Sequence, residues 1–263
     1  METQNSKWNE VLSAALAVPG VKINRDEFLI AAFTPYGTTE QARTLNQKRP
    51  IEAYSQRTLD EVANGIIRRY TAYVTTASTV AGLPGGWGML VSIPADMAQF
   101  YAQLLIVAQK LAYIYGWPDL SDENNKLGDG ALGILTLFVG IAFGVEGAEK
   151  AIQTVAATAA KHWTKKLPTM VLTKTAWYPI VKKVAAWLGI KITKDSVGKA
   201  VGKFIPLLGG VISGTVTYIS FKPMAKRLKK ELSLAQTIAQ ENAQNNENAE
   251  QTTDKFEEAE VVD

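Results

Sequence analysis

The sequence of 263 residues contains no cysteine. This absence excludes disulfide bonds, thiol catalysis and cysteine-ligated metal sites. The chain has a single histidine, His162, which lies near the expected C-terminal end of a helix. Interaction with the helix dipole, or simple exposure, explains such a residue better than base catalysis does. We therefore expect no metal ion and no other cofactor.

Motifs that mark common enzyme classes are missing as well. The sequence has no Gly-x-Ser-x-Gly nucleophile motif and no phosphate-binding loop that ends in Gly-Lys-Ser or Gly-Lys-Thr. The glycine-rich run from Gly82 to Gly88 is neither preceded by a strand pattern nor followed by a lysine, so it does not match a phosphate-binding loop. We expect a protein that is not an enzyme.

Long apolar runs are scarce, although three segments carry no charge: residues 70–95, 130–145 and 204–221. A membrane-spanning helix needs about 20 predominantly apolar residues. The first segment is rich in threonine and glycine, and the second is too short. The third is the best candidate for a span, but Pro206 and several glycines weaken it. We expect buried core helices, and the alternative is an integral membrane protein with one or two glycine-rich helical insertions.

Helical periodicity runs through most of the chain, and no convincing strand pattern is present. Apolar residues recur at helical spacing over 6–17, 55–81, 95–115, 130–145, 146–167, 176–189, 195–220 and 222–240. Asn24 and Glu27 have capping-box spacing ahead of a further short helix. Gly189 and Pro223 are expected to end helices. Met170 to Thr173 is the best candidate for a strand, but it is too short to build a sheet.

These patterns predict an all-α fold with a single compact helical domain and glycine-rich central helices. We expect an N-terminal helical extension over residues 1–50, the main domain over 51–240 and a disordered acidic tail over 241–263. Glycines at four-residue spacing, such as Gly140 with Gly144, favour close packing of helices. A structural role is expected for a set of small residues: Gly82, Pro84, Gly85, Gly86, Pro206, Gly209, Gly210 and Gly214.

Acidic residues are nearly missing from one part of the chain. Residues 161–230 hold fifteen lysines and arginines with a single acid, whereas residues 231–263 hold nine acids and one lysine. Because tryptophan and large apolar residues are interleaved with the basic ones, the block is typical of a surface that binds an anionic membrane. The candidate membrane-binding residues are Lys182, Lys183, Trp187, Lys199, Lys203, Lys222, Lys226, Arg227, Lys229 and Lys230.

Two other interpretations of the basic block remain open. Lysines on an amphipathic helix are commonly a solvated face without a partner. Nucleic acid is a competing anion, but no recognition motif or paired aromatic platform is present, so we expect no nucleic acid partner. The acidic tail is a candidate competitor that folds back on the basic surface.

Asp96 is the one carboxylate in an otherwise uncharged stretch from residue 70 to residue 109. Its position at the start of the helix predicted over 95–115 indicates N-terminal capping or helix-dipole stabilisation. A buried ion pair with Arg68 or Arg69, or a polar site in an enzyme of unknown reaction, are the alternatives.

Two segments resemble the EcsC family of bacterial proteins. The first comprises Gly82-Leu83-Pro84-Gly85-Gly86-Trp87-Gly88, Asp96 and the apolar helix that ends at Tyr115-Gly116; the second runs from Ile205 to Gly214 and continues through Tyr218 to the basic helix from Phe221. The resemblance covers about residues 55–230, and Thr215 and Thr217 stand where many relatives have asparagine. It implies a helical accessory protein near an ABC transporter, with no catalytic residues. The polar N-terminus lacks a signal-peptide core, so we expect a cytoplasmic protein at the inner face of the cell membrane.

Overall fold

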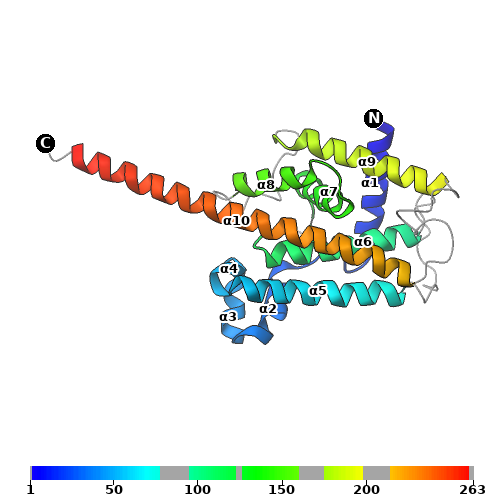
Figure 1. Ribbon diagram of the computed structural model, residues 1–263, viewed down its shortest axis with the longest axis horizontal. Coiled ribbons are helices and arrows are strands. Elements are labelled where there is room, and N and C mark those ends of the chain that lie inside the picture. The colour runs from blue at the N-terminus through cyan, green and yellow to red at the C-terminus, as the bar shows by residue number, and fades with distance from the viewer. Residues whose placement is uncertain (1, 78–94, 123–125, 160–174, 198–213, 261–263) are drawn as a thin grey trace.

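The computed structural model describes residues 2–77, 95–122, 126–159, 175–197 and 214–260, and it shows the expected helical fold (Figure 1). Within these ranges the only β pairing is a single bridge between Ser121 and Leu127. The strand candidate at 170–173 lies outside the described residues. The longer helices are α1 (Glu2–Leu16), α2 (Arg25–Phe33), α5 (Gln56–Ala77), α6 (Ala95–Ile114), α7 (Asp129–Phe143), α8 (Ala148–Ala159), α9 (Tyr178–Val197) and α10 (Gly214–Glu260). Four short helical segments join α2 to α5: η1 (Thr34–Tyr36), α3 (Thr39–Arg43), η2 (Thr44–Asn46) and α4 (Pro50–Ala53).

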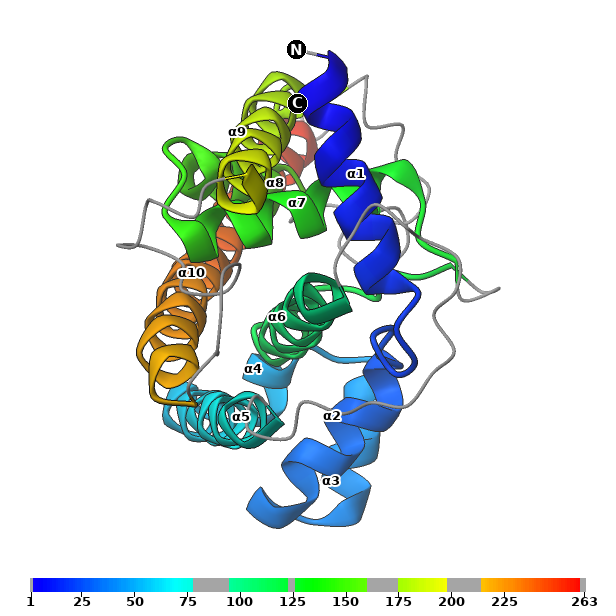
Figure 2. The ribbon, with the colours of Figure 1, turned by 90° about the vertical axis from the view of Figure 1, so that its right-hand side faces the viewer.

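Helix α6 lies at the centre of the molecule, with α1, α5, α7 and α10 around it (Figure 2). Leu104, Leu105, Ala108 and Leu111 of α6 are fully buried. Residues 129–143 form α7, and nearly all of its side chains from Gly130 to Ala142 are buried. The charge-free segment 130–145 therefore forms core helix rather than lipid-facing surface.

The first 50 residues pack against the same core as the rest of the chain. Trp8 of α1 is fully buried, and its Nε1 donates a hydrogen bond to Thr136 Oγ1 of α7 at 3.0 Å. The buried amide of Gln109 donates to the carbonyl oxygen of Val21 at 2.8 Å and thereby holds the α1–α2 connection on α6. At the start of α2, Asn24 Oδ1 accepts a hydrogen bond from Glu27 N at 3.0 Å, which confirms the predicted N-cap.

Helices α7 and α9 approach closely at Gly140. A Cβ atom at this position would lie 2.6 Å from Val184 Cγ1 and 3.2 Å from Ala148 Cβ. Four residues later, Gly144 has a φ angle of +71°, in the left-handed region, and caps the C-terminus of α7. The pair thus combines a contact that requires a small residue with a helix end that favours glycine.

The expected helix ends at Gly189 and Pro223 are wrong. Helix α9 continues through Gly189 to Val197, and α10 continues through Pro223. A proline inside a helix costs about 3 kcal/mol, because it removes a hydrogen bond and clashes with the preceding turn. Burial of the neighbouring Phe221, Met224 and Leu228 in the core offsets this cost.

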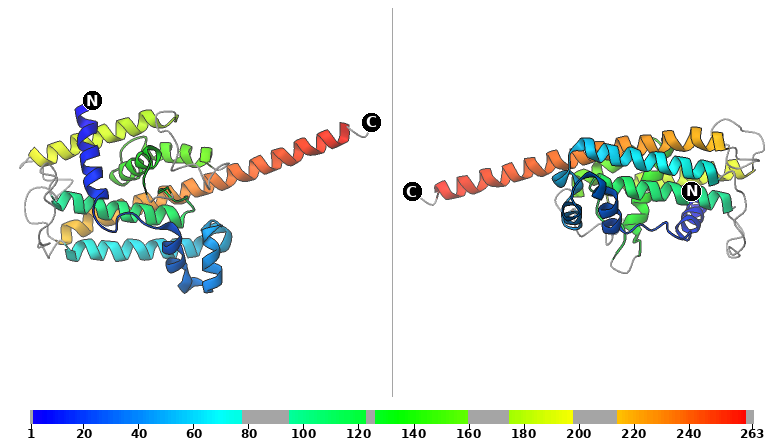
Figure 3. Two further views of the ribbon diagram at one scale, coloured as in Figure 1. Left: turned by 180° about the vertical axis from the view of Figure 1, so that it is seen from behind. Right: turned by 90° about the horizontal axis from the view of Figure 1, so that it is seen from below.

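The structure does not show the disordered tail expected over 241–263. Residues 241–260 continue α10, whose C-terminal part projects away from the other helices (Figure 3). This segment contains six glutamates and three alanines, which have high helix propensity, together with four asparagines, which have a lower one. Because the segment points outward, it does not fold back on the basic surface of its own chain.

Helix ends from distant parts of the chain meet at one end of the molecule. The C-termini of α5 and α9 and the N-termini of α6 and α10 lie together there, at the right of Figure 1 and facing the viewer in Figure 2. These ends flank residues 78–94 and 198–213, which contain most of two of the charge-free sequence segments.

Candidate functional site

Helix α9 presents the first group of predicted surface residues. Val181, Val184 and Leu188 are buried against the core, whereas Lys182 and Lys183 are exposed. The Lys182 ammonium lies 5.7 Å from the ring centroid of Tyr178, within the range of a cation–π contact. The helix therefore has the amphipathic arrangement expected from its sequence.

Trp187 lies at the border between the two faces of α9. Trp187 is 37% exposed, and the centroid of its ring lies 6.2 Å from that of Phe143 at the end of α7. The indole thus contacts a side chain of α7 and is also partly exposed to solvent. An indole in this position suits the boundary between an apolar phase and water.

Helix α10 carries five of the predicted basic residues, and two of them make contacts that stabilise the fold. Arg227 Nη1 donates a hydrogen bond to the carbonyl oxygen of Ala142 at 2.7 Å, near the C-terminal cap of α7. Lys229 is 18% exposed and lies 3.1 Å from Asp60 Oδ1. The free carbonyls and negative dipole end of a helix favour such an arginine.

The remaining basic residues of α10 differ in exposure. Lys226 and Lys230 are exposed, whereas Lys222 is half-buried. The side chain of Lys230 is 80% exposed, and its ammonium lies 3.9 Å from Oε1 of the buried Glu231, at the outer limit for an ion pair. Lys226 and Lys230 therefore keep their charge available to an external anion.

The basic residues of α9 and α10 do not form one continuous patch. The two helices run in opposite directions along the same side of the molecule, with α7 and α8 between them (Figure 1). Glu149 and Lys150 of α8 are exposed between the two strips. The sequence block of residues 161–230 is thus divided by the fold into separate basic strips.

Several predicted residues lie outside the described part of the chain: Lys199, Lys203, Gly82, Pro84, Gly85, Gly86, Pro206, Gly209 and Gly210. Asp96 is the second residue of α6, where a carboxylate favours the helix N-terminus. Gly214 is the first residue of α10.

A polar network that the sequence did not predict joins α5, α10 and the residue following α6. Tyr115 Oη donates to Asp60 Oδ1 at 2.6 Å, and Lys229 Nζ donates to Asn64 Oδ1 at 3.1 Å in addition to its ion pair with Asp60. Burial and the neighbouring Asp60 carboxylate raise the pKa of Tyr115 above its ordinary value. The four-residue spacing of Asp60 and Asn64 was the available sequence signal, but it did not identify their partners.

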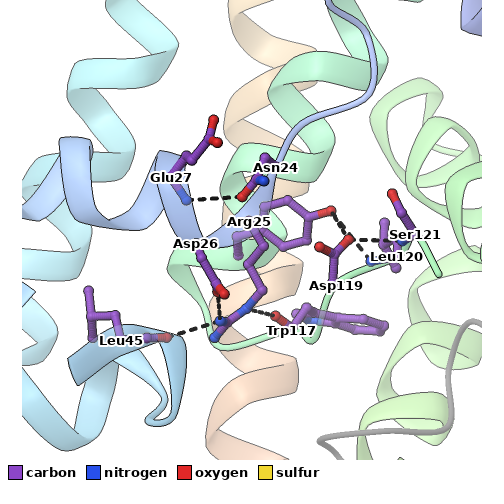
Figure 4. A network of polar contacts seen from close by, with 10 residues as sticks. Asn24, Arg25, Asp26, Glu27, Leu45, Trp117, Asp119, Leu120 and Ser121 are labelled. Atoms are coloured by element: carbon purple, nitrogen blue, oxygen red, sulfur yellow. Dashed lines mark hydrogen bonds and ion pairs between the residues drawn. The ribbon is translucent and has the colours of Figure 1, made fainter. Parts of the chain in front are cut away.

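A second network lies at the same C-terminal end of α6 and stabilises the loop that follows it (Figure 4). Arg25 donates to the carbonyl oxygens of Trp117 at 3.1 Å and Leu45 at 3.0 Å, which ties α2 to two other segments. Tyr113 Oη donates to Asp119 Oδ1 at 3.3 Å, and burial with the nearby Asp119 charge raises the pKa of Tyr113. These hydrogen bonds connect α2, the segment at Leu45 and the loop after α6, so we interpret the network as structural.

No group of three or more histidine, aspartate or glutamate residues suited to a metal ion occurs within the described ranges. In the same part of the chain, no helix has the length and apolar character needed to cross a membrane. Comparison with known proteins gave no relative: no family model, no curated protein and no solved structure matches the chain.

Proposed function

We propose that this protein is a non-enzymatic accessory protein that binds the anionic inner face of the cell membrane. The observation that carries the proposal is the arrangement of α9. Its exposed Lys182 and Lys183 are followed one turn later by the partly exposed indole of Trp187. Near an anionic leaflet each lysine contributes about 1 kcal/mol, and tryptophan favours the interfacial zone.

The charge distribution supports a partner of negative charge. Among residues 175–192, whose side chains the structure describes, α9 and the turn before it contain no acid. On α10, Lys226 and Lys230 add further exposed positive charge. Most of their apolar neighbours on the two helices are buried in the core, so lysines make up much of the exposed surface of α9 and of α10 up to Lys230.

The EcsC resemblance supports the accessory role and the neighbourhood of an ABC transporter. Both remain proposals that rest on sequence motifs at residues 82–88 and 205–214. Co-purification of the transporter with a tagged chain from solubilised membranes tests this part. Recovery of the chain in the membrane fraction without a transporter would limit the proposal to lipid binding.

Vesicle sedimentation tests membrane binding directly. We expect the full chain to bind vesicles that contain phosphatidylglycerol and not vesicles of phosphatidylcholine alone, with weaker binding as salt screens the charges. The variant Lys182→Gln/Lys183→Gln is expected to bind about thirtyfold more weakly if both lysines contribute about 1 kcal/mol each.

A matched control is available on the far side of the fold. Arg43→Gln/Lys48→Gln removes the same charge from two exposed residues near α3, so it should leave vesicle binding unchanged. Equal loss in both double variants would show that net charge, and not α9, governs binding. Absence of binding to phosphatidylglycerol vesicles at low salt would refute the proposal.

A further inference from the structure

The outer sides of α5 and α10 meet along a line of residues, which we call the α5–α10 seam. It comprises Gln56, Asp60, Asn64 and Arg68 of α5, with Ile219, Lys222, Lys226, Lys229 and Ser233 of α10. The spacing of four residues on α5, and of three and four on α10, places each set along one side of its helix.

Contacts between side chains of the two helices fix the register of this seam. Gln56 Nε2 donates to Ser233 Oγ at 3.2 Å, and Lys229 contacts both Asp60 and Asn64 at 3.1 Å. Residue numbers rise along α5 as they fall along α10, so the helices are antiparallel. One turn beyond Asn64, the register places Arg68 at the level of Lys222 and Lys226.

The two halves of the seam differ in chemistry. Near Asp60 the polar groups are paired with one another, and Lys229 is largely covered. Toward the end of α5 the seam has no acid: residues 62–77 and 214–230 contain only basic charges. Arg68 and Lys226 are exposed there. Like charges that lie at the same level on two packed helices create a positive potential on this part of the surface.

An exposed apolar side chain accompanies these charges. Ile219 is 63% exposed and lies at the tip of the seam, one turn before Lys222. Tyr73, which is 51% exposed, lies at about the same level on α5, but it follows Arg68 by five residues and therefore lies on another face of that helix. An exposed aliphatic side chain that precedes lysines by one turn matches the change from apolar to charged groups across the headgroup region of a membrane.

We infer that the α5–α10 seam is the edge of the protein that enters the lipid headgroup layer. In this arrangement Arg68 and Lys226 bind phospholipid phosphates, while Ile219 reaches the acyl-chain boundary. The inference rests on the proposed membrane-binding function and adds the orientation of the protein on the membrane. The projecting C-terminal part of α10 then points away from this edge, because it lies at the other end of the same helix.

Single-cysteine labelling tests the orientation, because the natural chain has no cysteine. An environment-sensitive fluorophore is attached to Ile219→Cys or, as a matched control, to Leu234→Cys, which replaces a residue that is 43% exposed on the same helix. The two positions are about 22 Å apart along the axis. With phosphatidylglycerol vesicles, we expect a blue shift and quenching by spin-labelled lipid at Ile219→Cys, and continued quenching by aqueous iodide at Leu234→Cys.

Charge variants provide an independent measurement. Arg68→Gln/Lys226→Gln is expected to weaken vesicle binding about thirtyfold, or about fivefold for each charge. Arg43→Gln/Lys48→Gln serves again as the control with equal charge loss. Circular dichroism and urea unfolding of each variant establish that a loss of binding does not result from a loss of fold.

The outcomes separate the orientation from the proposed function. If the wild-type chain binds vesicles but the Ile219→Cys probe stays accessible to iodide, the orientation is wrong and membrane binding stands. The same conclusion follows if Arg68→Gln/Lys226→Gln binds as well as the control. If the wild-type chain does not bind phosphatidylglycerol vesicles, both proposals fail.

Discussion

Replacement of Gly140 by alanine tests the close contact between α7 and α9. The new Cβ would lie 2.6 Å from Val184 Cγ1, which is closer than non-bonded carbon atoms approach, and 3.2 Å from Ala148 Cβ. Val184 and Ala148 are fully buried, so neither can move toward solvent without opening the core. The β-branched side chain of Val184 also has one strongly preferred rotamer in a helix.

The expected magnitude follows from two opposing effects. Overpacking of this kind costs about 1–3 kcal/mol, whereas replacement of glycine by alanine inside a helix contributes up to about 1 kcal/mol of stability. Gly65→Ala is a matched control, because Gly65 lies within α5 and a Cβ there would meet no heavy atom within 4 Å. Gly65→Ala should therefore stabilise the protein, and Gly140→Ala should be less stable than Gly65→Ala by about 2 kcal/mol.

Urea unfolding of the wild type and both variants measures this difference, provided that the slopes of the transitions agree. Adding Val184→Ala to Gly140→Ala removes the atoms that clash, so the double variant should show a favourable coupling relative to the sum of the single changes. If Gly140→Ala and Gly65→Ala are equally stabilising, α7 and α9 have room at this crossing and the packing argument is refuted.

Three further predictions concern α10 and its contacts. Arg227→Ala, which removes the hydrogen bond to the Ala142 carbonyl oxygen at 2.7 Å, should lower the free energy of unfolding by about 1 kcal/mol in urea titrations, with no matching loss in Lys226→Ala. The raised pKa of Tyr115 keeps its phenol protonated in the folded state, whereas the unfolded chain releases this proton near pH 10. The free energy of unfolding should therefore fall as the pH rises above about 10. In the Tyr115→Phe variant this decrease should be less steep. Deletion of residues 241–263, which removes mostly acidic charge, should strengthen binding to phosphatidylglycerol vesicles at low salt; unchanged or weaker binding would show that this segment does not oppose the membrane.

The helices could be predicted from the sequence where apolar spacing, caps and breakers agree. The cap at Asn24 and the buried character of residues 130–145 depend on local residues and on one helical face, which a sequence displays. The path of α10 through Pro223 depends on burial of its neighbours by other helices. Local propensity therefore gave the wrong helix end.

The candidate surface was predictable in composition but not in detail. The lack of acids identified the basic helices, and the spacing identified the exposed Lys182 and Lys183. The use of Lys229 in the network with Asp60 and Tyr115 depends on residues more than 50 positions apart, which no local pattern brings together. The α5–α10 seam likewise arises only when two distant helices are aligned in register.

The length and direction of α10 give the protein a large electric dipole. Apart from Lys255, its basic residues lie between Lys222 and Lys230, its last turns carry acids, and its peptide dipoles add a partial positive charge at the N-terminus and a partial negative charge at the C-terminus. These contributions add along one axis. Near a negatively charged surface the field exerts a torque that turns the basic end inward and the acidic tip outward before any side chain makes contact. The acidic end of α10 thus helps to orient the protein, so that its basic end faces the membrane as the protein approaches.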